Sequence, residues 1–376
     1  MIILPNMKSI IGKKISAIPQ KIIVGGAFTS YDGTAQNYIT RLNSDGTRDT
    51  EFTIGTGFST EVFATAVQSD GQILVGGNFT TYQGATANRI ARLNSSEYLD
   101  YDFSLTTGAG ASNTVRSIEI QSDGSIVIGG NFTSFAGTST NRIVRIFSSG
   151  FRDGGFTIGT GFNNVARKVA IQSDGKIVVG GNFTAYNGTS RSRIIRLNSN
   201  GSVDTGFTIG SGFDAQVITI AIQPDGKILA GGSFIDYNGT TQNRITRLNS
   251  DGTRDTGFTI GTGFLSNVNA IAIQSDGKIV VGGGFGFYQD ITANRIIRLN
   301  SDGTRDSGFT TGTGFSGNVN ALAIQSDGKI VVGGNFGSYN GTSTLYICRL
   351  NSNGTLDTGF TIGTGLDYFV NSITLT

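Results

Sequence analysis

An arginine and an aspartate recur eight positions apart in each of seven related segments of this 376-residue sequence. A guanidinium is planar and always charged, so it can make two parallel hydrogen bonds to a carboxylate across a hairpin. We therefore expect a structural ion pair in each segment that fixes a turn, with an exposed anion site as the alternative. The pairs are Arg41–Asp49, Arg92–Asp100, Arg145–Asp153, Arg196–Asp204, Arg247–Asp255, Arg298–Asp306 and Arg349–Asp357.

Residue types that catalysis commonly needs are scarce. The sequence has no histidine, which excludes a Ser-His nucleophile and a histidine-ligated metal. A pair of carboxylates acting as acid and base, as in glycoside hydrolysis, is the remaining option. Most aspartates fall in turns, however, and Glu51, Glu61, Glu97 and Glu119 all lie in the first third of the chain. We predict that the protein is not an enzyme; an enzyme acting on polysaccharide is the alternative.

An aromatic residue recurs in the longer loop of every segment, among Asn, Gln and Thr. Aromatic rings beside amides are a common way for proteins to contact sugar rings or partner surfaces, which makes this set the candidate ligand face. The alternative is that each ring packs over its own segment, because a position that is aromatic in all copies serves the fold first. The residues are Tyr31, Tyr82, Phe135, Tyr186, Tyr237, Tyr288 and Tyr339.

The sequence indicates no cofactor and no metal site. Its Asp-Gly turns lack the ligand spacing and the downstream Glu of a dedicated calcium loop. The lone Cys348 cannot form an internal disulfide and replaces Ile, Val, Thr or Ala of other copies, so we expect a buried thiol. Asn-Gly-Thr at Asn187, Asn238 and Asn340 fits the N-glycosylation pattern, which an Asn/Thr-rich repeat also produces by chance.

A repeat of about 50 residues positions all these side chains. A Gly-Gly pair begins at Gly25, Gly76, Gly129, Gly180, Gly231, Gly282 and Gly333, at steps of 51, 53, 51, 51, 51 and 51 residues. In one repeat we expect strands at Val268–Ile273, Lys278–Gly283, Arg295–Asn300 and Gly308–Phe315, separated by Asp-Gly turns and one longer loop. No stretch has a 3.6-residue period, so no helix is expected.

Four antiparallel strands per repeat are typical of a β-propeller blade. The sequence therefore predicts an all-β fold, a seven-bladed β-propeller with two sets of phenylalanines, beginning at Phe28 and Phe52, in the core between blades. Residues 370–376 repeat the first strand of a further unit, so we expect this C-terminal strand to close the ring. Residues 19–376 would be one propeller domain and residues 1–18 an N-terminal arm or partial strand, with pairing of Lys14–Ile18 left open.

Charge and hydropathy limit the partners. Charged residues are 14% and the formal net charge is +2, which gives no basic stripe for nucleic acid. No apolar run approaches the roughly 20 residues of a membrane span, so no membrane insertion is expected. The N-terminus lacks the pattern of a secretory signal peptide.

At the segments GGNF, RI-x-RLN-SDGT-x-D and the closing GF, the chain resembles the delta-60-type repeat family of bacterial and phage-borne propellers. The resemblance covers nearly all of residues 17–376. It implies a β-propeller with extracellular or surface use, and it carries no catalytic residue to transfer. Repeat two departs most, with NSSEYLD and GAGAS, and repeat six has Gly284 and Asp290 at positions that differ from the pattern.

Together these features favour a non-enzymatic structural or binding propeller displayed on a surface. We favour a phage virion component, in a tail, fibre or outer attachment, that contacts a host glycan or a partner protein, with residues 1–18 as a docking arm to virion or cell-surface proteins. A bacterial secreted or cell-surface, adhesin-like propeller is the alternative, and an intracellular interaction scaffold is the third possibility.

Overall fold

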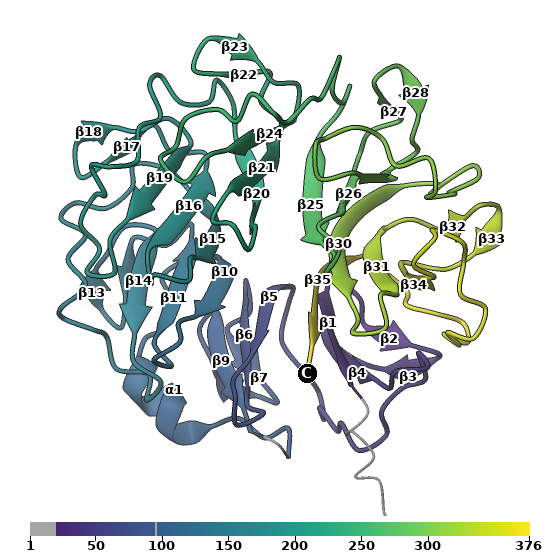
Figure 1. The fold of residues 1–376 in the computed structure, drawn as a ribbon. Helices are drawn as coiled ribbons and strands as arrows, with labels where there is room; N and C mark the ends of the chain where they lie inside the picture. Colours follow the sequence, from purple (N-terminus) through teal and green to yellow (C-terminus); the bar gives the residue numbers. More distant parts are fainter. Residues whose placement is uncertain (1–19, 95) are drawn as a thin grey trace, which may run out of the picture.

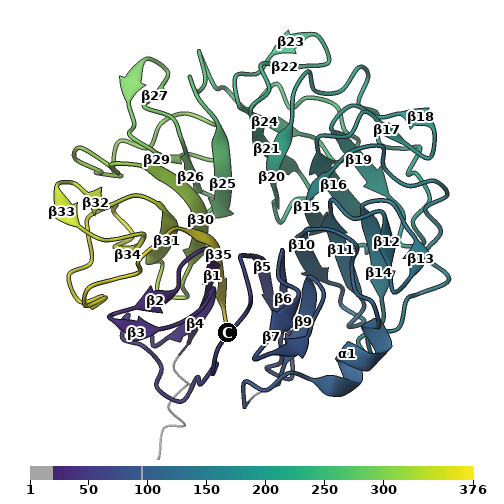
Figure 2. The same cartoon turned by 180° about the vertical axis from the view of Figure 1, so that it is seen from behind.

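Seven three-stranded antiparallel sheets are arranged around a central opening in the computed structural model, which describes residues 20–94 and 96–376 (Figures 1 and 2). The expectations of an N-terminal arm in residues 1–18 and of strand pairing by Lys14–Ile18 lie outside the described residues. Each sheet comes from one repeat, apart from the first, which combines both ends of the described chain.

The sheets, from the first to the seventh and from the innermost strand outward, are β35 (Val370–Leu375), β1 (Ile22–Gly26), β4 (Ile39–Leu42); β5 (Val62–Val67), β6 (Ile73–Gly77), β9 (Ile90–Leu93); β10 (Val115–Ile120), β11 (Ile126–Gly130), β14 (Ile143–Ile146); β15 (Ala166–Ile171), β16 (Ile177–Gly181), β19 (Ile194–Leu197); β20 (Val217–Ile222), β21 (Ile228–Gly232), β24 (Ile245–Leu248); β25 (Val268–Ile273), β26 (Ile279–Gly283), β29 (Ile296–Leu299); and β30 (Asn318–Ile324), β31 (Ile330–Asn335), β34 (Ile347–Leu350).

A short hairpin, in which each of the two strands has two residues, lies in the longer loop of each repeat, at the periphery of the molecule (Figure 1). The hairpins are β2–β3 (Ser30–Tyr31, Thr34–Ala35), β7–β8 (Thr81–Tyr82, Ala85–Thr86), β12–β13 (Ser134–Phe135, Thr138–Ser139), β17–β18 (Ala185–Tyr186, Thr189–Ser190), β22–β23 (Asp236–Tyr237, Thr240–Thr241), β27–β28 (Phe287–Tyr288, Ile291–Thr292) and β32–β33 (Ser338–Tyr339, Thr342–Ser343).

The expected fourth strand is wrong. Only a single bridge, from Leu299 to Arg305, continues the sixth sheet outward, and residues 308–315 contain no strand. The chain instead crosses to the next repeat, where the Thr310 amide donates to the Asn353 carbonyl at 2.8 Å. Gly312 and Gly314 then adopt φ values of 55° and 71°, which turn the chain and prevent an extended conformation.

The expectation that no helix would form is also wrong. Helix α1 (Tyr101–Thr107) replaces the connecting segment in repeat two (Figure 1). The Asp100 carboxylate caps its first turn by accepting from the Phe103 amide at 3.1 Å. The segment YDFSLTT has no glycine, so a short helix becomes accessible there. No helix in the described part of the chain is long and apolar enough to cross a membrane.

The C-terminal strand completes the first sheet. Strand β35 pairs antiparallel with β1, with Ile22 opposite Leu375 and Val24 opposite Ile373. It also contacts the innermost strands β30 and β5 of the sheets on either side. The seven innermost strands therefore contact one another in an unbroken order around the opening, with the two ends of the described chain side by side.

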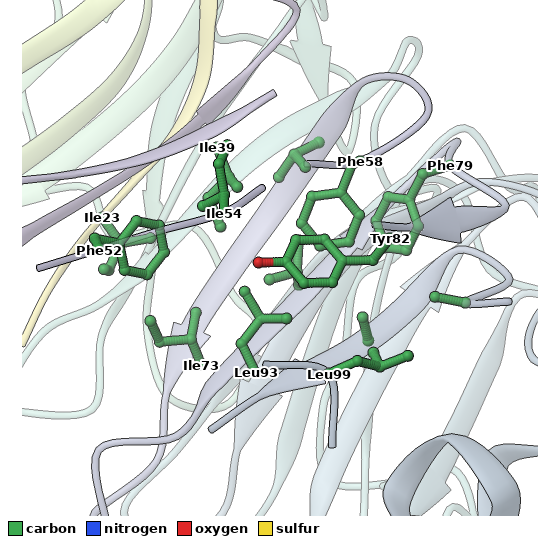
Figure 3. Close-up of a cluster of buried hydrophobic side chains, with 14 residues drawn as sticks. Ile23, Ile39, Phe52, Ile54, Phe58, Ile73, Phe79, Tyr82, Leu93 and Leu99 are labelled. Carbon is green, nitrogen blue, oxygen red and sulfur yellow. The ribbon is translucent and has the colours of Figure 1, made fainter. Parts of the chain in front are cut away.

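The apolar core is divided among the spaces between neighbouring sheets. In one cluster, Ile23 of the first sheet and Ile73 and Leu93 of the second enclose Phe52 and Phe58 from the connection between them (Figure 3). An equivalent cluster joins the seventh sheet to the first. Fully burying one such side chain stabilises the fold by about 1.5–3 kcal/mol, so every sheet depends on both of its neighbours.

The Gly-Gly pair permits this close packing. A Cβ added at Gly180 would lie 2.6 Å from Val217 Cγ1 of the next sheet, and one at Gly181 would lie 2.1 Å from the Val165 carbonyl oxygen. Side chains larger than hydrogen do not fit at these distances, so Gly180 sets the approach of one sheet to the next, and Gly181 sets the approach of two strands within its own sheet.

We predict that Gly180→Ala lowers the free energy of unfolding by about 1–3 kcal/mol, because the added methyl group overpacks against Val217. Urea denaturation followed by circular dichroism measures this. Gly154→Ala is the control, since a Cβ at Gly154 meets no atom within 4 Å. Equal stability of the two variants would contradict the role given to the glycine pair.

Candidate functional site

The seven Arg–Asp pairs are structural. Each arginine is on the outermost strand of its sheet, and its aspartate follows the turn after that strand. In every pair the arginine Nε donates to the aspartate Oδ2, at 2.6 to 2.9 Å. The guanidinium also lies over the phenylalanine three residues beyond the aspartate, with 4.5 to 5.0 Å between the guanidinium carbon and the ring centroid. Each arginine is therefore held by both a carboxylate and an aromatic face.

The same arginines also join neighbouring sheets, a contact that the eight-residue spacing of Arg and Asp does not predict. The Arg247 Nη1 donates to the Ser301 carbonyl of the next repeat, and Arg349 donates in the same way to the Ser44 carbonyl of the first. With these donors engaged inside the fold, the alternative of an exposed anion site at the seven arginines is wrong.

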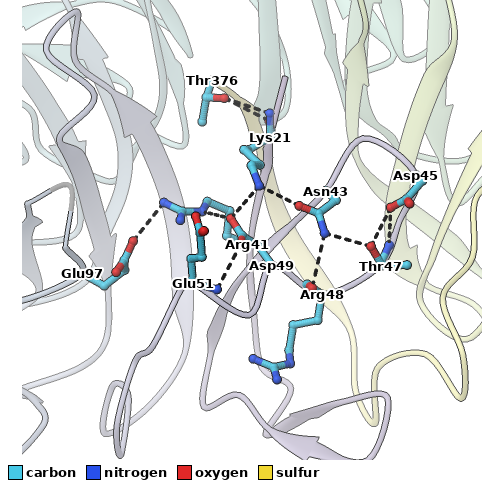
Figure 4. Close-up of polar contacts among 10 residues, drawn as sticks. All are labelled: Lys21, Arg41, Asn43, Asp45, Thr47, Arg48, Asp49, Glu51, Glu97 and Thr376. Atoms are coloured by element: carbon cyan, nitrogen blue, oxygen red, sulfur yellow. Dashed lines mark hydrogen bonds and ion pairs between the residues drawn. The ribbon is translucent and has the colours of Figure 1, made fainter. Parts of the chain in front are cut away.

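Repeat two shows how this network tolerates a substitution. Glu97 occupies the position of the turn glycine and adopts a φ of 62°, a conformation unfavourable for a residue with a side chain. Its carboxylate contacts Arg41 Nη1 at 3.0 Å, while Arg41 Nε pairs with Asp49 (Figure 4). Burial raises the pKa of Glu97, and the Arg41 charge opposes that shift.

A lysine reinforces the pair in most repeats. Lys227 Nζ donates to Asp255 Oδ2 at 2.8 Å, and Lys278 Nζ donates to Asp306 Oδ2 at 2.9 Å. Burial alone would raise the pKa of each carboxyl, but the hydrogen bonds from the lysine, the arginine and a glycine amide outweigh it. They hold the pKa of both aspartates at about 2.

The candidate ligand-face aromatics are buried, so their interpretation as a ligand surface is wrong. Their side chains are at most 2% exposed. The tyrosine hydroxyls donate to turn carbonyls of their own sheets at 2.5 to 2.8 Å, as from Tyr237 to Gly252. The rings pack on the connecting phenylalanines, with Tyr237 and Phe213 centroids 4.5 Å apart. The residues for which the predicted ligand-binding role is wrong are Tyr31, Tyr82, Phe135, Tyr186, Tyr237, Tyr288 and Tyr339.

The central channel, of about 870 Å³, is the candidate functional site. It lies between the seven innermost strands (Figure 2). Each of these strands has a β-bulge at its second residue, or at its third in β30. In β10, for example, Arg116 is skipped between Val115 opposite Gly130 and Ser117 opposite Gly129. A bulged residue has no partner across the strand pair, and its side chain is re-aimed. We call these seven residues the channel mouth: Phe63, Arg116, Arg167, Ile218, Asn269, Asn320 and Asn371.

Asparagines form one arc of the channel mouth. The Asn269 side-chain amide donates to the Val319 carbonyl at 3.3 Å, Asn320 donates to Val370 at 3.2 Å, and Asn371 donates to Val62 at 3.0 Å. Each asparagine thus links its strand to the next one around the channel. The arc presents amides to the channel without any formal charge.

Arginines form the opposite arc. Arg116 lies over the Phe63 ring, with 4.8 Å from the guanidinium carbon to the centroid, and Arg167 Nε donates to Asn182 Oδ1 at 3.1 Å. Burial lowers the pKa of Arg116, although the charge of Glu61 opposes this. Burial also lowers the pKa of Arg167, and the nearby Arg116 charge lowers it further.

Carboxylates are sparse in the channel. Of the described residues that line it, Glu119 alone is acidic, and Lys168 holds its carboxylate at 2.6 Å. A pair of free carboxylates for acid–base hydrolysis is therefore not assembled by the described lining. Cys348, the lone thiol, is buried as expected, and burial raises its pKa.

The channel mouth cannot be recognised from residues that all repeats share, because its seven residues differ between repeats. This position follows the valine that begins the V-x-A-I-A-I run, or Ala166 in repeat four, and it is Phe, Arg, Ile or Asn in different repeats. The signal in the sequence that could have identified the channel mouth is this variation at one position of an otherwise uniform repeat.

We predict that stability falls as the pH drops from about 5 to about 2. The pKa values of Asp255 and Asp306 are depressed to about 2 in the folded protein, so the stability they contribute is present above the unfolded value near 4 and is lost on acidification. Asp255→Asn should make this dependence shallower by about 2 kcal/mol. Urea titrations at a series of pH values measure it, and identical slopes for the two proteins would refute it.

We predict that Tyr237→Phe lowers the free energy of unfolding by about 1 kcal/mol, because its hydroxyl donates a buried hydrogen bond to Gly252. Phe135 at the same position of repeat three shows that a ring without the hydroxyl fits. Thermal denaturation measures the change. A variant as stable as the wild type would show that this bond is not stabilising.

Three solved structures are among those that are similar to this chain. The WD40 β-propeller domain of Doa1 is 13% identical, covering 80% of this chain and 83% of that chain, with a TM-score of 0.49. Virginiamycin B lyase from Staphylococcus aureus is 16% identical, covering 79% and 83%, with a TM-score of 0.47. PorZ, a bacterial surface component of the type-IX secretion system of Porphyromonas gingivalis, is 13% identical, covering 88% and 45%, with a TM-score of 0.46. At these values none of them carries an argument about function.

A comparison with curated proteins gave no match. A family model matches seven segments, at residues 21–52, 68–103, 121–156, 172–207, 223–258, 274–309 and 325–360. These segments are the seven repeats of the sequence and together make up more than half of it. The resemblance to a family of repeat propellers is thereby confirmed, and the chain belongs to the family described as "Domain of unknown function (DUF5122) beta-propeller".

Proposed function

We propose that this propeller is a non-catalytic binding module that holds a saccharide at the channel mouth. The observation that carries this proposal is the variation of chemistry around the mouth, from Asn269, Asn320 and Asn371 on one arc to Arg116 and Arg167 on the other. Repeats selected only for stacking have no need of different side chains at one bulged position.

The uniform residues of the repeats support the proposal by elimination. The recurring arginines and aspartates hold one another, and the recurring tyrosines donate to backbone carbonyls. Amide and guanidinium donors that converge on a concave site suit the hydroxyl groups of a sugar, and the channel volume of about 870 Å³ falls within the usual range for small-ligand sites.

For the location of the protein, we propose display on a phage particle, in a tail, fibre or outer attachment. Display on a bacterial cell surface is the alternative. A partner protein reached through residues 1–18 belongs to the same proposal.

We predict binding to at least one class of glycan on an array of neutral and acidic saccharides. Asn269→Ala combined with Asn320→Ala should weaken binding to a neutral glycan about tenfold, through two lost hydrogen bonds. Asn353→Ala is the control, because this exposed residue lies in a turn at the opposite end of its sheet. Fractionation of phage particles and host cells tests the location.

Failure to bind any glycan, together with absence from particles and from the cell surface, would refute this function. Binding that the double variant leaves unchanged would remove the channel mouth as the site.

A further inference from the structure

We propose that the channel mouth binds a carboxylate-bearing saccharide, with Arg116 and Arg167 holding the carboxylate. This inference rests on the proposed function, since it takes the same mouth as the binding site and names its ligand class. It assigns the sugar hydroxyls to the asparagine arc.

The two arginines form a pair of neighbouring like charges. Arg116 is on β10 and Arg167 is at the equivalent position of the adjacent strand β15. Within the described residues, neither of them forms an ion pair. Glu61 is the acidic residue whose charge acts on Arg116, but it lies beyond ion-pair distance. This contrasts with the seven outer arginines, each of which has its own aspartate.

Asn182 orients the Arg167 guanidinium through a hydrogen bond. Its side-chain oxygen accepts from Arg167 Nε at 3.1 Å, and its backbone carbonyl accepts from Arg193 Nη1. Two guanidiniums therefore donate to one residue. The terminal nitrogens of Arg167 have no hydrogen-bond partner in the described chain and remain available as donors.

An anion would relieve the energetic cost of this arrangement. Burial disfavours the charged form of both arginines and lowers the pKa of each, and the nearby Arg116 charge lowers the pKa of Arg167 further. Guanidiniums offer paired N–H groups whose spacing matches the two oxygens of a carboxylate. The described channel lining supplies no free carboxylate, because Lys168 engages Glu119.

The rest of the mouth favours a sugar acid over a small inorganic anion. The uncharged Asn269, Asn320 and Asn371 amides lie on the arc opposite the arginines, where they can meet hydroxyl groups. A channel of about 870 Å³ is far larger than a sulfate or phosphate ion needs. A ligand with one carboxylate and several hydroxyls uses both arcs.

Isothermal titration calorimetry of the full chain with digalacturonate, N-acetylneuraminate, the methyl ester of digalacturonate and inorganic sulfate tests the proposal. We expect binding of at least one acidic saccharide, weakened about tenfold or more by Arg116→Gln or Arg167→Gln and abolished in the double variant. Added salt should weaken the binding, and the methyl ester should bind at least tenfold more weakly than the acid.

Arg191→Gln is the matched control. It removes the same charge from the same repeat, beside hairpin β17–β18 at the periphery, where Arg191 Nη1 donates to the Ser190 carbonyl at 2.8 Å (Figure 1). We expect it to leave the dissociation constant unchanged within twofold. Arg167→Lys keeps the charge but loses the paired donors, so we expect affinity between those of the wild type and Arg167→Gln.

The outcomes separate this inference from the proposed function. If neutral glycans bind at the channel mouth and acidic saccharides do not, the inference is wrong and the proposed function stands. If sulfate binds as tightly as the sugar acids, the site is an inorganic-anion site and the inference is wrong. If no saccharide binds at all, both are wrong. Unchanged affinity in the Arg116→Gln and Arg167→Gln variants, with folding shown intact by circular dichroism, also overturns it.

Discussion

Each three-stranded sheet of this protein is apolar on both faces, and the rest of the structure depends on covering both. A sheet of strands such as β26, buried along its whole length, cannot leave either face in water. Stacking against one neighbour covers one face only. The seventh sheet packs against the first through β35, which removes the two uncovered faces that a linear stack would leave.

Two kinds of contact set the distance between adjacent sheets. The first glycine of each pair allows the backbone of one sheet to approach the valine of the next, as at Gly231 and Val268. At the outer end, the arginine side chain reaches across to a turn carbonyl, as from Arg298 to Ser352. A buried charge pair is weak evidence of net stabilisation, because removing two charges from water is costly. The directed hydrogen bond to the next sheet gives the arginine a second role, in fixing the orientation of neighbours.

Much of the fold could be predicted from the sequence, since one pattern recurs seven times. The period, the three inner strands and the Arg–Asp pairing all follow from local residue types and spacing. The fourth strand could not be predicted reliably, because GFTTGTGF contains Phe and Thr, which favour strands, but also glycines at positive φ, such as Gly314. Whether this segment forms a strand or turns away depends on a contact with the next repeat, through Thr310. Helix α1 forms in a repeat whose connecting segment, YDFSLTT, has no glycine, and Asp100 caps it.

The site was predicted less well than the fold, for a related reason. Tyr237 looks exposed in sequence because its neighbours Asp236 and Asn238 are polar, yet a residue in a two-residue strand can point inward while its neighbours point outward. A residue that recurs in every repeat serves the packing of the sheets, because every sheet needs the same contacts with its neighbours. The saccharide that we propose as the ligand is not seven-fold symmetric and would meet the ring at one place. Recognition therefore has to come from positions where the repeats differ, and the bulge at Arg116 and Arg167 is such a position, because a residue without a strand partner can change with little effect on the sheet.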